Sequence, residues 1–136
     1  MKKILVVDDD VAVLEMVQLT LEGAGYRVQT SLNGACFQRM HSDLPDLILL
    51  DILLSGEDGR ELCRQLKGDE QTRHIPVILF SAHFSAMDTT TMSGADAFLP
   101  KPFHLVELRD LVKRHLYTEE PTRGRGSSSD NLPVNI

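Results

Sequence analysis

The sequence predicts an α/β fold: a single domain with a doubly wound parallel sheet and helices on both faces. Three observations support this prediction. Short apolar runs alternate with stretches of helical period, as a series of βα units requires. Two of these runs, Leu47–Leu50 and Val77–Phe80, are wholly apolar, which is typical of central strands that are covered on both faces. The length of 136 residues suits one domain with its own core.

Five segments are predicted to form the strands. Tyr26–Thr30 is more polar than the others, so we expect it at an edge of the sheet. Ala97–Leu99 is the shortest and comes last. The predicted strands are Lys3–Val7, Tyr26–Thr30, Leu47–Leu50, Val77–Phe80 and Ala97–Leu99.

The segments between the strands are predicted to be helical. Asp10 and Asp58 are expected to act as N-caps of the helices that follow them, and residues 56–59 are expected to form a loop. Ser85–Met92 is a weak helix because its three threonines lose rotamer freedom in helices. The expected helices contain Leu14, Val17 and Leu21; Gly34–Met40; Glu61–Leu66; Ser85–Met92; and Leu105, Leu108, Val112 and Leu116.

Composition and charge exclude several classes of protein. The net charge of −6 argues against non-specific binding of nucleic acid, which needs a basic surface. No apolar run approaches the roughly 20 residues that span a bilayer. Because Met-Lys-Lys leads directly into a strand, we expect no signal peptide and a cytoplasmic protein, with Cys36 and Cys63 as reduced thiols.

The composition changes after Tyr117. The following residues include Glu119-Glu120-Pro121 and a run rich in glycine, arginine and serine, with few apolar side chains. We therefore expect residues 1–117 to form the domain and residues 118–136 to form a disordered tail or linker.

Polar side chains follow four of the predicted strands at the point where each strand ends. Asp8 and Asp9 follow the first strand, Asp51 the third, Ser81 the fourth and Lys101 the fifth. Because the carboxyl ends of parallel strands open on one edge of the sheet, these side chains are expected to converge there.

Three carboxylates at one edge would repel one another unless they shared protons or held a cation. Oxygen ligands without His or Cys suit Mg²⁺, or Mn²⁺, better than zinc. Mg²⁺ usually takes one or two carboxylates, which would leave another as a nucleophile. Asp51 is the best nucleophile candidate because it stands singly at the end of a central strand. The adjacent Asp8 and Asp9 are better suited to holding the metal.

These residues resemble the receiver domain of two-component response regulators over roughly Lys2 to Leu116. The resemblance rests on several elements in the right order: Asp8-Asp9, the run Asp51-Ile-Leu-Leu-Ser-Gly-Glu-Asp-Gly59, Ser81-Ala82, and Gly94-Ala-Asp-Ala-Phe-Leu-Pro-Lys-Pro-Phe103. It implies a flavodoxin-like five-stranded sheet of order 2-1-3-4-5.

The resemblance also implies a role for each residue of the site. Asp51 is the expected phosphoacceptor, and Mg²⁺ is expected on Asp8, Asp9, Asp51 and the backbone carbonyl of Leu53. Lys101 is expected to pair with the phosphoryl group and to precede a cis peptide bond to Pro102. Ser81 and Phe98 are the expected switch pair, which reshapes the surface formed by the fourth helix, fifth strand and fifth helix.

Two kinds of departure from the family pattern stand out. Ser55 stands where the family usually has Pro. Leu53 and His83 occupy the positions two beyond Asp51 and Ser81, which influence loss of the phosphoryl group in the family. Because Leu53 should hinder an attacking water, we expect slow intrinsic dephosphorylation.

The functional hypothesis is a signalling switch, not an enzyme with a separate substrate. It accepts a phosphoryl group from a histidine kinase or phosphotransfer protein, catalyses its own phosphorylation and dephosphorylation, and acts on a downstream protein or a fused output domain. A phosphorylation-dependent dimer is an open option, while nucleic-acid binding by this chain and membrane insertion are not expected.

The alternatives are a small phosphatase of the haloacid-dehalogenase type and a pseudo-receiver used only for docking. The phosphatase signature would need Thr or Val where this chain has Ala12.

Overall fold

A five-stranded parallel sheet forms the centre of the computed structural model, which describes residues 1–82 and 94–117. The strands lie in the order β2-β1-β3-β6-β7, and every neighbouring pair is parallel. This confirms the predicted order 2-1-3-4-5, because β4 and β5 form a separate antiparallel hairpin. The strands are β1 Lys3–Val7, β2 Arg27–Ser31, β3 Leu47–Asp51, β4 Leu53–Leu54, β5 Glu57–Asp58, β6 Val77–Ser81 and β7 Ala97–Pro100.

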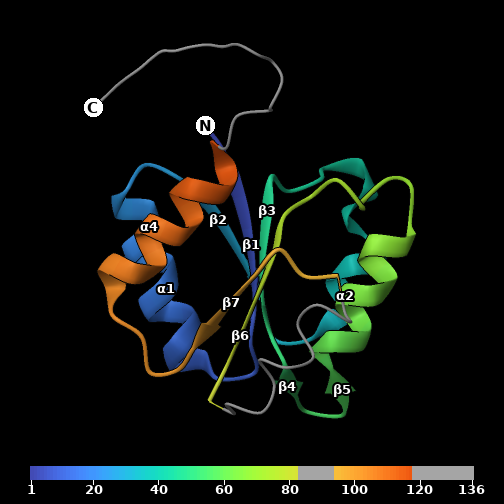
Figure 1. Ribbon diagram of the computed structural model, residues 1–136, viewed down its shortest axis with the longest axis horizontal. Helices are drawn as coiled ribbons and strands as arrows, with labels where there is room; N and C mark the ends of the chain where they lie inside the picture. The colour runs from blue at the N-terminus through green and yellow to red at the C-terminus, as the bar shows by residue number, and fades with distance from the viewer. Residues whose placement is uncertain (83–93, 118–136) are drawn as a thin grey trace.

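Helices cover both faces of the sheet, as a doubly wound fold requires. Helices α1 and α4 lie on one face, and α2 lies on the other together with the short 3₁₀ turns η1 and η2 (Figure 1). Their bounds are α1 Val11–Gly23, η1 Gly34–Gln38, η2 Met40–Ser42, α2 Gly59–Gly68 and α4 Leu105–Leu116.

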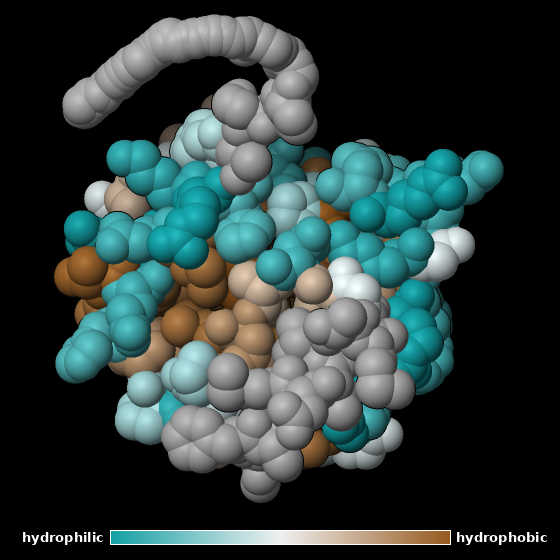
Figure 2. Space-filling model, viewed as in Figure 1, coloured by the Kyte–Doolittle hydropathy of each residue, from teal (hydrophilic) through white to brown (hydrophobic). Residues whose placement is uncertain are grey.

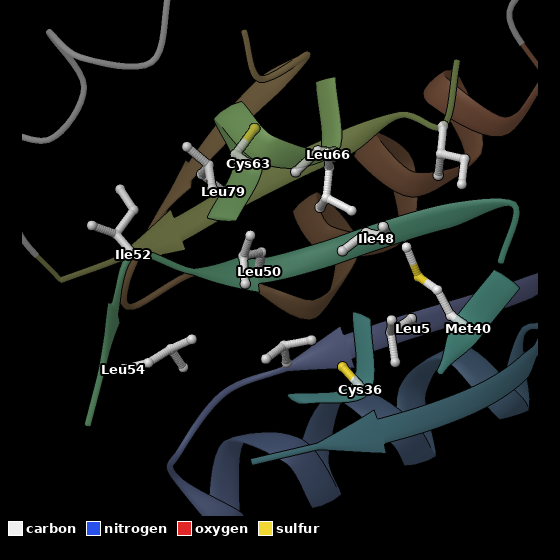
Figure 3. Packing of buried hydrophobic residues seen from close by; sticks show 13 residues of the cluster. Leu5, Cys36, Met40, Ile48, Leu50, Ile52, Leu54, Cys63, Leu66 and Leu79 are labelled. Carbon is white, nitrogen blue, oxygen red and sulfur yellow. The ribbon is translucent and has the colours of Figure 1, made fainter. Parts of the chain in front are cut away.

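The core consists of two apolar layers, one on each face of the sheet. Every residue of β1, β3 and β6 is buried, as predicted for central strands covered on both sides. Figure 3 shows the layer beneath α2, where side chains such as Leu50 and Leu79 pack with Cys36 and Cys63. The two cysteines are not joined in a disulfide, and burial raises the pKa of Cys36.

Local signals in the sequence account for the helix starts and for the edge strand. Asp10 caps α1 by accepting hydrogen bonds from the backbone N–H groups of the first turn, and Asp58 caps α2 in the same way. Both caps were predicted. Strand β2 lies at the predicted sheet edge and is partly exposed along its length, although it spans Arg27–Ser31 and not Tyr26–Thr30.

Two details of the prediction were wrong. Gly34–Met40 forms 3₁₀ turns and not one helix; Gly34 is a weak helix former, and its N–H is bonded to the Glu57 carboxylate. Residues 56–59 are not only a loop, because β5 pairs with β4 there. The predicted last helix is confirmed as α4, in which Leu108 and Val112 are buried and Leu105, at the first position, is exposed.

Two predicted segments lie outside the described residues: the helix at Ser85–Met92 and the tail at residues 118–136. Among the residues that are described, no helix has the length and apolarity needed to cross a membrane.

Candidate functional site

The predicted polar residues meet at the carboxyl edge of the sheet. Asp8 and Asp9 directly follow β1, and Asp51 is the last residue of β3. Ser81 is the last residue of β6 and lies opposite Pro100 of β7, so Lys101 comes one residue beyond this level. Parallel register therefore brings together side chains that are up to 93 positions apart in the sequence, as in the bond between Lys101 and Asp8.

The three aspartates form one cluster of carboxylates. Asp8, Asp9 and Asp51 each offer one oxygen, and these oxygens all lie within 4.8 Å of one another. Asp8 is 0% exposed and Asp51 is 5% exposed, whereas Asp9 faces solvent. The cluster is thus a shallow acidic site with two buried members and one at the rim.

Lys101 is the cation of this cluster. Its Nζ lies 2.8 Å from Asp8 Oδ2 and 3.6 Å from Asp51 Oδ2, and 4.8 Å from the centre of the Phe80 ring. Its backbone N–H donates to the carbonyl of Ser81 at 2.8 Å, which ties the residue to the end of β6. The Lys101–Pro102 peptide bond is cis, as expected.

Burial and a neighbouring negative charge change the acidity of Asp51. Removal from water, together with the charge of Asp8, raises the pKa of Asp51 to about 6. The ammonium of Lys101 and the hydrogen bond from the Leu53 N–H act in the opposite direction but do not cancel the effect. The single positive charge of Lys101 therefore does not balance the negative charge of the carboxylates. A further positive charge at the site would reduce the repulsion between them.

Each carboxylate of the cluster is oriented by a hydrogen-bond donor. Asp8 Oδ1 accepts from the N–H of Asp10 at 2.9 Å, and Asp51 Oδ1 accepts from the N–H of Leu53 at 3.3 Å. Asp9 Oδ2 accepts from the hydroxyl of Ser55 at 2.8 Å. The sequence reasoning marked Ser55 only as a departure from a family pattern and missed this contact.

The hairpin β4–β5 lies against the cluster and is itself anchored. Gly59 donates its N–H to the carbonyl of Ile52 at 2.7 Å, and a β-carbon at Gly59 would lie 2.1 Å from the main-chain oxygen of Asp51. Only glycine therefore permits this close approach of α2 to the end of β3. On the other side, the Glu57 carboxylate accepts from the N–H of Gly34 at 2.8 Å. Gly59 thus allows α2 to pack against the end of β3 beside the site. The sequence analysis quoted this glycine within a motif and assigned it no role.

The donors present fit a hard divalent cation. The cluster offers carboxylate oxygens only, which suits Mg²⁺ or Mn²⁺ better than a metal that prefers nitrogen or sulfur. Its three negative charges exceed what Lys101 offsets, so a divalent cation would bring the site close to neutrality.

Ser81, Phe98 and Leu53 are the remaining predicted residues in the described part of the chain. Ser81 is 1% exposed, and Phe98 is half-buried against the apolar layer beneath α2. Leu53 is 48% exposed. The roles of Ser81 and Phe98 as a switch pair, and of the Leu53 carbonyl as a metal ligand, remain predictions. His83 lies outside the described residues.

Known proteins of one family match this chain. The family model described as "Response regulator receiver domain" matches residues 4–113. The DNA-binding dual master transcriptional regulator RpaA of Synechocystis sp. is 41% identical over 116 residues, which cover 83% of this chain and 48% of RpaA. The response regulator PleD of Caulobacter vibrioides is 41% identical over 139 aligned positions, covering 97% of this chain and 30% of PleD. The chain thus spans about half the length of these relatives, or less.

Solved structures agree with these matches. The signal receiver domain of a signal transduction histidine kinase from Syntrophus aciditrophicus has a TM-score of 0.80 and 36% identity, and the match covers 92% of this chain and 97% of that one. The response regulator TrrA from Thermotoga maritima, in complex with Mg²⁺ and BeF, has a TM-score of 0.77 and 30% identity, with 85% of this chain and 99% of that one covered. These matches lend no support to the phosphatase alternative. The chain belongs to the response regulator receiver domains, regulatory modules of phosphorylation-dependent signalling in two-component systems.

Proposed function

We propose that Asp51 is the residue on which this domain is phosphorylated. The observation that carries the proposal is the cluster of three carboxylates within 4.8 Å, with one lysine ammonium beside two of them. Asp51 is the member that belongs to a central strand, whereas Asp8 already accepts bonds from Asp10 and Lys101 on its two oxygens. Asp51 Oδ2 lies 3.6 Å from Lys101, so a phosphoryl group on it would remain near the ammonium.

The transfer step follows from this arrangement. A carboxylate oxygen of Asp51 forms a bond to phosphorus while the bond from phosphorus to the donor's imidazole nitrogen breaks, and the electron pair of that bond returns to the imidazole. Lys101 offsets the negative charge on the phosphoryl oxygens. Asp8, Asp9 and Asp51 would hold Mg²⁺ together with the Leu53 carbonyl, and the cation would supply further positive charge at the same point. The domain thereby catalyses its own phosphorylation.

The donor is a phosphohistidine protein, either a histidine kinase or a phosphotransfer protein. Small phosphoryl donors share the required chemistry and serve as probes of the same step. The relatives suggest that the domain controls an output domain in the same polypeptide or a separate protein target. RpaA of Synechocystis sp. and PhoB of Rhizobium meliloti are both named as transcriptional regulators, and the match to this chain covers 48% and 54% of their lengths.

The output surface is proposed to include β7, which is the fifth strand of the main sheet, and α4, which is the last of the predicted helices. Ser81 and Phe98 would change together when the phosphoryl group arrives, because Ser81 ends β6 and Phe98 lies in the adjacent β7. Figure 2 shows exposed apolar side chains on the face that carries α4, and Leu105 and Val106 in its first turn are 41% and 59% exposed. A partner or a second phosphorylated copy would bury these side chains.

Intact-protein mass spectrometry tests the proposal. Incubation with acetyl phosphate should add one phosphoryl group when Mg²⁺ is present and none in excess EDTA. The variant Asp51→Asn should take up no phosphoryl group, whereas the matched variant Asp110→Asn, on the exposed side of α4, should behave as wild type. Equal labelling of Asp51→Asn and wild type would overturn the assignment of the acceptor.

A further inference from the structure

We propose that Ser55 is a positioning residue that holds the Asp9 carboxylate within the acidic cluster and thereby increases its affinity for a divalent cation. The inference rests on the proposed cation-dependent function of the site. It concerns the hydroxyl of Ser55, which donates a hydrogen bond to Asp9 Oδ2 at 2.8 Å.

Asp9 differs from the other two acids in its surroundings. Asp8 and Asp51 are buried and fixed by backbone donors and by Lys101, whereas Asp9 faces solvent. Within the described part of the chain, the hydrogen bond that its carboxylate accepts is from the Ser55 hydroxyl, at 2.8 Å. Without that donor, the side chain would be free to rotate into solvent.

Electrostatics makes this rotation favourable when no cation is bound. The carboxylate oxygens of Asp8, Asp9 and Asp51 all lie within 4.8 Å of one another, so their negative charges repel at short range. An exposed Asp9 lowers this repulsion by turning away from Asp8 and Asp51. A hydroxyl donor opposes the movement, because it stabilises the ionised carboxylate in the position where it faces its neighbours.

The position of Ser55 in the chain makes this bond an effective restraint. Ser55 lies between β4 and β5, next to Gly56, whose φ of +77° forms the turn. The same hairpin carries Leu53, whose N–H donates to Asp51. One hairpin therefore orients two of the three acids, and the Glu57 contact with Gly34 anchors its far strand.

A preoriented ligand binds a cation more tightly because less freedom is lost on binding. Removal of a hydrogen-bond partner that orients a metal ligand typically weakens affinity by about 10-fold to 100-fold. Because Asp9 and Ser55 are exposed, we expect the lower end of this range.

The test is a Mg²⁺ titration of the whole chain, followed by ¹⁵N–¹H NMR of the backbone amides. Ser55→Ala should weaken Mg²⁺ binding about 10-fold, and Ser55→Thr, which keeps the hydroxyl, should restore binding to near the wild-type value. In an Asp9→Asn background, Ser55→Ala should have little further effect. Urea denaturation in EDTA should show that Ser55→Ala is folded with wild-type stability, since the lost contact is at the surface.

The outcomes separate this inference from the proposed function. If wild type binds Mg²⁺ and Ser55→Ala binds it equally well or more tightly, the positioning role is wrong while the proposed function stands. The positioning role is also wrong if Ser55→Thr binds as weakly as Ser55→Ala, or if Ser55→Ala weakens binding equally in the Asp9→Asn background. If wild type itself shows no amide shifts with Mg²⁺, the proposed cation site fails, and the inference fails with it.

Discussion

Replacing Asp51 by Asn should make the metal-free protein more stable at neutral pH. Asn has nearly the same shape as Asp but carries no charge, so the change removes one of three repelling carboxylates. Lys101 keeps its ion pair with Asp8 at 2.8 Å, and the cluster loses one buried negative charge. The substitution thus removes the proposed chemistry while relieving the electrostatic cost of the site.

The pKa of Asp51 and the spacing of the carboxylates set the magnitude. The pKa of Asp51 is raised to about 6, roughly 2 units above that of an unfolded Asp, which corresponds to about 3 kcal/mol at a pH above both values. The separation of at most 4.8 Å between carboxylate oxygens gives a repulsion of about 3 kcal/mol per pair at an effective dielectric near 20, part of which Lys101 offsets. We expect a gain of about 2 kcal/mol.

The pH dependence gives the sign of the effect. Because the pKa is higher in the folded protein than in the unfolded chain, ionisation of Asp51 disfavours folding. This cost is absent below about pH 4, grows as the pH rises, and is complete above about pH 6. The stability gain of Asp51→Asn should therefore appear above about pH 6 and vanish near pH 4.

Urea denaturation in EDTA at these pH values measures the effect, with Asp110→Asn as the control for loss of an exposed charge. The reasoning is refuted if Asp51→Asn is no more stable than wild type above about pH 6. A gain that persists unchanged near pH 4 would show that charge is not its cause.

Three further predictions concern neighbouring residues. Gly59→Ala should destabilise the protein by about 3 kcal/mol or more, because its β-carbon would lie 2.1 Å from a main-chain oxygen of β3. The control Gly68→Ala should cost nothing, because no atom lies within 4 Å of its β-carbon, and thermal unfolding compares the two variants. Lys101→Met should lower the free energy of unfolding without metal by about 3 kcal/mol, because it leaves the buried carboxylate of Asp8 without its cation. Added Mg²⁺ should recover part of this loss in the same thermal unfolding assay. Leu53→Asn should speed loss of the phosphoryl group, because a polar side chain at the rim would admit and orient water; an unchanged decay rate would exclude this role.

The architecture and most of the site follow from the sequence for a physical reason. Parallel strands covered on both faces must be apolar along their whole length, so a polar residue marks the strand end. This simple signal located Asp8, Asp51 and Ser81, and the common edge of a parallel sheet explains why they meet. Helix caps are equally local, and Asp10 was recognised from its position alone.

The features that the sequence did not predict depend on tertiary contacts. The bond from Ser55 to Asp9 joins residues 46 positions apart, and it exists only because the β4–β5 hairpin folds back beside β1. In the same way, the Glu57 carboxylate accepts from the N–H of Gly34, 23 positions away in the sequence, at the start of the 3₁₀ turns that stand where the local pattern indicated a helix. Neither contact has a periodicity that a sequence pattern would reveal.

A crystal structure of the chain with Mg²⁺ and beryllofluoride would test most directly where magnesium and a phosphoryl mimic bind. We predict that the beryllofluoride is attached to a carboxylate oxygen of Asp51, beside Lys101, and that the cation lies among Asp8, Asp9 and Asp51. A structure in which the beryllofluoride is bound elsewhere, or in which these three carboxylates point apart around no cation, would contradict the account.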